Sequence, residues 1–415
     1  MRSDRAQRGF TVAELAVSLL VTIVLILGVL SLFDFSSRLS RVQTNVADMQ
    51  QSLRVSLQDT VRMVRMAGRG GLPLGSVPTG LAMAVRDNVA ANTRIAGGST
   101  PLIVEGTDAI TVRGVFRNPI WQINSANPAS FNLTTVAGAP VRGTVQIATS
   151  TPTGIPQDLS ALRALVLNPV RVPEALILVS PRDATVYAVV ELNAATSDVN
   201  TNPNLYTIGF TITGGTNTAQ YLPLSSGGGW PVALTNVAFV GILEEFRYYV
   251  RDDAAGPRLS RAQAFPGTQL PWRNDNDASV TNDAHPNWSQ DIADNILDLQ
   301  IALGFDTPQG GGAMTDDDNG TGNDDRIFEA ADGQNDDWLY NDTQAFNAAT
   351  WNGPPLYFIR FSILARTDRR DPQFQAPLLA WIEDHNLSLS KYNLRNERMY
   401  RRRVLETLID VRNLG

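Results

Sequence analysis

Glu14 is the only charged residue in an apolar run of 24 residues that extends from Phe10 to Phe33. A carboxylate at bilayer depth costs on the order of 3 kcal/mol, and less near the interface, so it normally has a partner or a function. A free α-amine at Phe10, released by cleavage after Gly9, could pair with Glu14 of a neighbouring helix and fix the axial stagger of the two helices. The alternative is an interfacial glutamate that snorkels into the headgroups, and spacing alone leaves both interpretations open.

A second group of carboxylates lies in an acidic insert, residues 316–342, which holds ten acidic residues and one arginine. Asp and Asn side chains among glycines supply the oxygen ligands that Ca²⁺ prefers. The spacing resembles an EF-hand loop, except that the glutamate expected at the last position falls one place late. A solvated acidic loop is the competing interpretation. The candidate calcium ligands are Asp317, Asn319, Thr321, Asp325 and Glu329.

Enzyme motifs are missing from the sequence. It contains no G-x-S-x-G, H-E-x-x-H or P-loop pattern, and its only histidines, His285 and His385, lie far apart without metal-ligand spacing. Glu244 and Glu245 are adjacent on a predicted strand, so their carboxylates should point to opposite faces and not act as a pair. We therefore expect no catalysis, no cofactor other than the possible calcium, and no small-molecule substrate.

A basic and aromatic cluster near the C-terminus could contact DNA. The acidic balance of the chain, with 41 Asp and Glu against 34 Lys and Arg, favours the alternative that these arginines face solvent or pair with acids of the same chain. No nucleic-acid partner is therefore expected. The cluster comprises Arg395, Arg398, Arg401, Arg402, Arg403, Tyr392 and Tyr400.

The apolar run, residues 10–33, is long enough to span a membrane, because 24 residues of helix extend about 36 Å. Arg2, Arg5 and Arg8 precede it, which predicts a cytoplasmic N-terminus and export of the remaining chain. The run is longer than the apolar part of a secretory signal, and no A-x-A-like site follows it. We therefore expect a retained, single-pass helix in the inner membrane.

The next segment, residues 34–67, keeps helical spacing of its apolar residues but is otherwise polar. Steps of three and four residues predict one apolar stripe that packs on the protein's own globular part, and Gly68 and the glycines after it end the helix. The stripe comprises Leu39, Val42, Val46, Met49, Leu53, Leu57, Val61 and Val64.

The remaining chain, residues 68–415, reads as a β-rich head of one large domain or two lobes, without cysteine and hence without disulfides. Its Gly-, Asn-, Thr- and Pro-rich stretches indicate turns between strands. A long N-terminal helix beside antiparallel sheets gives an α+β fold class. Strands are predicted at 109–116, 175–179, 186–192, 206–212, 239–250, 296–305, 356–365 and 405–412.

The short basic leader (residues 1–9), Gly9, the sequence FTVAE and the apolar helix together resemble the class III signal of type IV pilins and type II secretion pseudopilins. The resemblance implies that prepilin peptidase cleaves between Gly9 and Phe10, that Phe10 is N-methylated, and that Glu14 makes the amine contact described above during assembly. The implied partners are other pilins or pseudopilins, bound through the N-terminal helix. After leaving the inner membrane the subunit would enter an extracellular pilus or a periplasmic pseudopilus.

Three further stretches, RVSLQDTVRMVRMAGRGG, EEFRYYVRDDAAGPRLSRA and RRRVLETLIDVRNLG, resemble minor pilins of the PilW type. The resemblance implies a subunit at or near the pilus tip that primes assembly or touches a surface. Pseudopilins of the GspJ type, which would contact secreted cargo at the tip of a type II secretion system, are the alternative. A membrane-anchored enzyme whose leader is never cut is a third hypothesis.

Overall fold

The computed structural model describes the chain in thirteen stretches. They are residues 11–72, 82–86, 88–90, 102–134, 141–167, 174–183, 185–212, 230–252, 256–264, 289–305, 338–340, 356–383 and 385–410.

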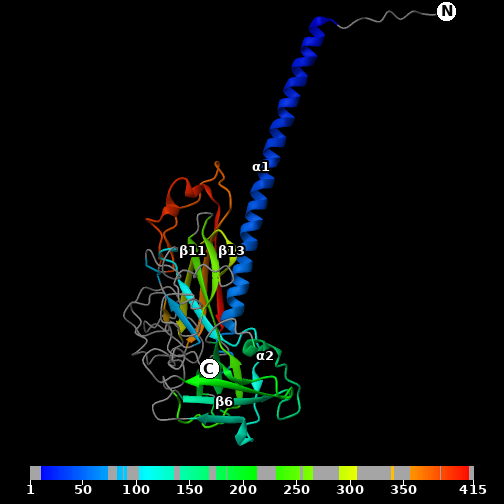
Figure 1. The fold of residues 1–415 in the computed structure, drawn as a ribbon. Coiled ribbons are helices and arrows are strands. Elements are labelled where there is room, and N and C mark those ends of the chain that lie inside the picture. The colour runs from blue at the N-terminus through cyan, green and yellow to red at the C-terminus, as the bar shows by residue number, and fades with distance from the viewer. Residues whose placement is uncertain are drawn as a thin grey trace, which may run out of the picture.

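One continuous helix of 54 residues, α1 (Val12–Arg65), runs from the N-terminal end of the described chain into the head (Figure 1). At 1.5 Å per residue it is about 80 Å long. It ends where the predicted glycines follow, since Gly68, Gly70 and Gly71 all adopt positive φ angles that β-carbon-bearing residues avoid. The backbone amide of Gly68 donates to the carbonyl of Arg113, so this turn also joins the helix end to strand β3 (Ala109–Gly114).

The head divides into two lobes. We call residues 121–242 the inserted lobe, because they lie between two neighbouring strands of one sheet, and the rest of the head together with the second half of α1 the helix lobe. In Figure 1 the inserted lobe, with β6 (Val141–Ala148) and α2 (Ser160–Leu167), occupies the end of the molecule farthest from the N-terminus. The strands described here pair antiparallel throughout both lobes, which confirms the predicted α+β class.

Two sheets form the helix lobe. The first has the order β1-β3-β11-β12-β13, with β2 paired to β11, and the second has the order β15-β14-β16-β19. Between β13 and β14 only Asn295, with φ of 60°, separates one sheet from the other. The bounds are β1 (Met83–Arg86), β2 (Leu102–Ile103), β3 (Ala109–Gly114), β11 (Glu244–Asp252), β12 (Arg258–Ala264), β13 (Ser289–Asp294), β14 (Ile296–Phe305), β15 (Trp338–Tyr340), β16 (Leu356–Arg366) and β19 (Arg402–Asp410). A short hairpin, β17 (Trp381–Ile382) and β18 (His385–Asn386), and two 3-10 turns, Lys391–Asn393 and Glu397–Met399, precede β19.

The inserted lobe contains one seven-stranded sheet with the order β4-β10-β7-β8-β9-β6-β5. Leu162 and Val166 of α2 (Ser160–Leu167) pack with Trp121 and Phe210 in a core of its own. The bounds are β4 (Trp121–Gln122), β5 (Phe131–Thr134), β6 (Val141–Ala148), β7 (Ala175–Val179), β8 (Tyr187–Asp198), β9 (Leu205–Ile212) and β10 (Phe239–Ile242), with a 3-10 turn at Pro128–Ser130.

The strand predicted at 239–250 is in fact two strands in different sheets. Residues 239–242 form β10 in the inserted lobe, and residues 244–252 form β11 in the helix lobe. Leu243 lies at the crossing, where its amide donates to the carbonyl of Ala175 in β7. Nothing in the local pattern marks this break, because both strands are apolar and rich in aromatic and branched residues. Pairing with strands distant in the sequence decides it.

The apolar stripe of α1 packs against the helix lobe as predicted from Val46 to Val64. Met49, Leu53 and Val64 are buried with Ile359, Phe361 and other side chains of both helix-lobe sheets, while Val46, Leu57 and Val61 are partly buried. Leu39, at the other end of the predicted stripe, is exposed.

Candidate functional site

A capping box begins α1 and involves the glutamate singled out from the sequence. The Thr11 hydroxyl accepts from the Glu14 amide (3.3 Å), and the Glu14 carboxylate accepts from the Thr11 amide (2.9 Å) and hydroxyl (3.0 Å). The pattern T-x-x-E is a known sequence signal for such a cap. The Glu14 carboxylate therefore points toward the start of the helix. Gly9 and Phe10 themselves lie outside the described residues.

The first half of α1 exposes its apolar side chains on all sides. They range from 49% exposed at Ile23 to 87% at Val12, and no residue of its most apolar 18-residue stretch is buried in the protein. An apolar surface of this extent is far larger than soluble monomers expose, and the helix is long and apolar enough to cross a membrane. The hydroxyl of Thr22 donates to the carbonyl of Ser18 (2.8 Å), which satisfies this polar group inside the helix, as a hydrocarbon environment requires.

A polar contact ties the second half of α1 to the head. The Tyr248 hydroxyl donates to Asp59 (2.8 Å), and the Arg261 guanidinium lies 3.1 Å from the same carboxylate. Burial, with the neighbouring Asp59 charge as a smaller cause, raises the pKa of Tyr248 above its usual range. Asp59 borders the apolar stripe of α1 and contacts two strands of the head. The helix is thus fixed in register with the head by a hydrogen bond and an ion pair.

The two tyrosines of EEFRYYV have different roles. Tyr248 faces α1, whereas Tyr249 packs on the opposite side of β11 with Ile103 and Ala262. Both side chains are fully buried. The two adjacent tyrosines therefore fill the cores on the two opposite faces of the same sheet.

Glu244 and Glu245 also separate to opposite sides of β11, as predicted. Glu244 accepts from the amides of Phe116 and Arg117, and Glu245 accepts from the side chains of Arg113 and Arg247, both at 2.6 Å. Each carboxylate thus neutralises arginines or caps backbone groups where the inserted lobe joins the helix lobe. This arrangement serves structure, and it does not place the two acids together for catalysis.

His385 is the histidine that the structure describes. Its Nδ1 lies 2.8 Å from the buried carboxylate of Asp298, to which Gln300 also donates. Among the described residues, no three His, Asp or Glu side chains gather as metal ligands. His285 and the five candidate calcium ligands lie outside the described residues, so calcium binding by the acidic insert stays a prediction.

The basic and aromatic cluster is largely engaged inside the protein. Arg401 pairs with Asp371 (2.9 Å), Arg398 donates to the carbonyl of Ala376 (2.7 Å), and Arg402 donates to the carbonyls of Tyr392 and Glu397. Burial lowers the pKa of Arg402. Arg395 and Arg403 are exposed. Most of the cluster thus holds the chain before β19 in place, in agreement with the interpretation that these arginines pair within the chain.

Comparison with known proteins gives little. No family model and no curated protein matches the chain. Among solved structures, a type IV-like pilin from Thermus thermophilus matches with 11% sequence identity and a TM-score of 0.18, over 62% of this chain and all of that one. A likeness at this level establishes neither a shared topology nor a shared function.

Proposed function

We propose that this chain is a minor type IV pilin of the PilW type, placed at or near the tip of a pilus. The observation that carries the proposal is the division of α1 into an exposed apolar half and a half packed into the head. A helix that is apolar all round needs lipid or other helices, whereas a striped helix needs a folded partner. One helix that does both joins a large exported head to the membrane and to neighbouring subunits.

In this proposal the membrane is the starting point of assembly. The precursor lies in the inner membrane with its N-terminus in the cytoplasm, prepilin peptidase cleaves after Gly9, and Phe10 becomes the N-methylated first residue. Glu14 pairs with the amine of a neighbouring subunit, which sets the stagger of packed helices. The exposed position of the Glu14 carboxylate at the first turn of α1 supports this role.

Intact mass spectrometry of the membrane-extracted protein tests the processing step. We expect a chain that begins at Phe10 and carries one methyl group. A chain that retains residues 1–9 would contradict pilin processing and favour a membrane-anchored protein of another kind.

Substitution of Glu14 tests the assembly step, and the capping box supplies the control. Glu14→Ala removes both the carboxylate and one half of the cap, whereas Thr11→Ala removes the other half and keeps the carboxylate. We expect Glu14→Ala to abolish recovery of the protein in sheared filaments and Thr11→Ala to retain it. Equal loss in both variants would show that the cap, and not amine pairing, is what assembly needs.

A GspJ-like pseudopilin remains the alternative function. In that role the inserted lobe, which lies farthest from the membrane span, would contact secreted cargo. Deleting the gene distinguishes the two roles. Loss of pili with unchanged type II secretion supports the minor pilin, and the converse supports the pseudopilin.

A further inference from the structure

The part of the head nearest the membrane-spanning half of α1 is the segment 366–403, drawn orange to red in Figure 1. A groove of about 1140 Å³ separates it from the helix, with Ser31 to Asp48 on one side and Asp368 to Gln373 with Arg401 on the other. The groove thus begins at the last turn of the apolar run and extends along the polar helix. If α1 spans a bilayer, the segment 366–403 lies at or just above the headgroup layer, which is a few ångströms thick on each side.

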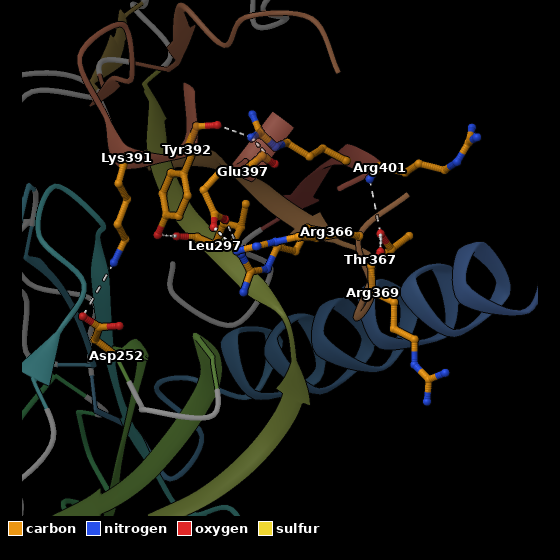
Figure 2. A network of polar contacts seen from close by, with 11 residues as sticks. Asp252, Leu297, Arg366, Thr367, Arg369, Lys391, Tyr392, Glu397 and Arg401 are labelled. Carbon is orange, nitrogen blue, oxygen red and sulfur yellow. Dashed lines mark hydrogen bonds and ion pairs between the residues drawn. The ribbon is translucent and has the colours of Figure 1, made fainter. Parts of the chain in front are cut away.

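The segment is cationic in an acidic protein. It contains nine Lys and Arg against five Asp and Glu, a net charge of +4, whereas the whole chain carries −7. Within the described part of the chain, the one ion pair of Arg369 is a long contact with Asp368 (3.9 Å), and its side chain is 77% exposed. In Figure 2 it points away from the polar network, on the side of α1. Arg395 and Arg403 are exposed as well.

The same segment exposes large apolar side chains. Trp381 is 59% exposed, Leu378 is 65%, Leu394 is 62% and Leu389 is fully exposed. Such residues among arginines are typical of surfaces that lie in the membrane interface, where a tryptophan ring or a leucine enters the headgroup layer and arginines meet lipid phosphates.

These side chains are exposed although the segment is firmly held. Arg366 pairs with Glu397 (2.6 Å), the Tyr392 hydroxyl donates to the carbonyl of Leu297 (3.4 Å), and Lys391 lies 3.7 Å from Asp252 (Figure 2). Ile382, Leu387 and Tyr392 are buried beside Leu297 and Leu364. The exposed Trp381 and Leu389 therefore lie within two residues of the buried Ile382 and Leu387, which hold the backbone of the segment in place.

We propose that the segment 366–403 docks on the anionic phospholipid headgroups of the membrane that α1 spans. This inference rests on the membrane insertion of α1 in the proposed function. Docking holds the head against the bilayer before assembly, with arginines on phosphates and Trp381, Leu389 and their neighbours in the interface. When the subunit leaves the membrane, the contact is released.

The experiment uses the full chain, which contains no cysteine, so that one introduced cysteine carries one fluorophore. Leu389→Cys places the label on the segment 366–403, and Ile155→Cys places it on an exposed site of the inserted lobe. Each protein is reconstituted into vesicles of phosphatidylcholine alone or with phosphatidylglycerol, with a quencher attached to a fraction of the lipid headgroups. We expect quenching at Leu389→Cys in the anionic vesicles only, and none at Ile155→Cys.

Charge reversal supplies the second measurement. Arg369→Glu combined with Arg395→Glu should lower the ratio of docked to undocked protein by about tenfold or more, because each arginine near an anionic surface contributes measurably to binding. Arg182→Glu, an exposed arginine of the inserted lobe, should leave quenching unchanged. Equal quenching with and without anionic lipid, or quenching that survives the double reversal, would overturn the proposal.

Two further outcomes separate this proposal from others. Flotation after an alkaline wash measures insertion of α1 itself: protein that does not float contradicts the proposed function together with the docking, whereas protein that floats without quenching contradicts the docking alone. If the label at Leu389→Cys becomes protected only when other pilins are added, the surface binds protein and the lipid proposal is wrong.

Discussion

The two halves of α1 have the same secondary structure and opposite surroundings. Large apolar side chains between Val12 and Phe35 are about half to nearly fully exposed, whereas Met49, Leu53, Met63 and Val64 are 0 to 6% exposed. The difference follows from the sequence pattern, since the first half is apolar on every face and the second half only on a stripe. One side of a protein domain can bury only one face of a helix. Burial of the other apolar faces of the first half therefore requires lipid or other molecules.

The largest effect should come from a matched pair of truncations, Leu53→Ala and Leu20→Ala. Leu53 is 2% exposed in the helix-lobe core, so its truncation leaves a cavity and should destabilise the head by about 2–5 kcal/mol. Leu20 is 64% exposed in the protein, and its truncation should leave head stability unchanged. Urea unfolding in detergent, followed by circular dichroism, measures both. Similar losses in the two variants would show that the halves are not independent.

The converse test places a charge in the first half. Leu20→Arg lies near the middle of the apolar run, where arginine costs roughly 3 kcal/mol of membrane insertion. We expect a clear decrease in the carbonate-resistant membrane fraction, with an unchanged unfolding transition of the head. Leu39→Arg, which lies beyond the run at an exposed site, is the control and should insert as well as the unmodified chain.

The sequence pattern predicted that one half of α1 is apolar on every face and the other only along a stripe. This was possible because the residues on each face of a helix recur about every 3.6 positions in the sequence. It also predicted the strands at 175–179 and 296–305 with the bounds that the structure has. It left one large domain and two lobes as alternatives and did not place the boundary, because the division at Leu243 depends on partners such as Ala175 and Gly114, which are far away in the sequence. The contact of Asp59 with Arg261 and Tyr248 was not predicted either, since the reach of these two side chains is a property of the folded head.

The candidate site also contains features that the sequence identified and features that stay predictions. Glu14 was recognised from its isolation in an apolar run, and its capping partner Thr11 could have been read from the T-x-x-E pattern. Cleavage at Gly9, methylation of Phe10 and calcium binding by the acidic insert stay predictions, because they concern residues outside the described chain or chemistry that geometry does not reveal.

A smaller effect is expected from the polar contact between the packed half and the head. Asp59→Asn keeps the shape of the side chain but removes the charge that Arg261 and Tyr248 share, which should cost about 1–2 kcal/mol because the group is partly exposed. Asp48→Asn, an exposed acid on the same helix, should change stability by less than about 0.5 kcal/mol. A double-mutant cycle with Tyr248→Phe then measures the coupling, and additive effects would contradict a direct contact in solution.

The smallest effect is the alkaline pH dependence that this contact introduces. Burial, and then the Asp59 charge, raises the pKa of Tyr248 in the folded protein, whereas an unfolded tyrosine ionises near pH 10. The contribution of Tyr248 to the free energy of unfolding is therefore fully present below about pH 10. It is lost as the pH rises further, because the unfolded tyrosine then releases its proton and is stabilised, whereas the folded one keeps it. Tyr187 of the inserted lobe, whose pKa burial raises to about 12, adds a loss of the same sign that is independent of α1.

The difference between the unmodified chain and Tyr248→Phe isolates the contribution of the Tyr248 hydroxyl, which combines its burial with its contact to Asp59. Above about pH 10 the urea midpoint of the unmodified chain should fall more steeply than that of Tyr248→Phe, and Tyr187→Phe should flatten the curve without changing the coupling to Asp59. Insertion of α1 into vesicles should not respond over the same range, because no tyrosine lies in its apolar half. If Tyr248→Phe and the unmodified chain lose stability in parallel, the hydroxyl is not buried against Asp59, and the ion pair with Arg261 and the apolar contacts anchor the packed half.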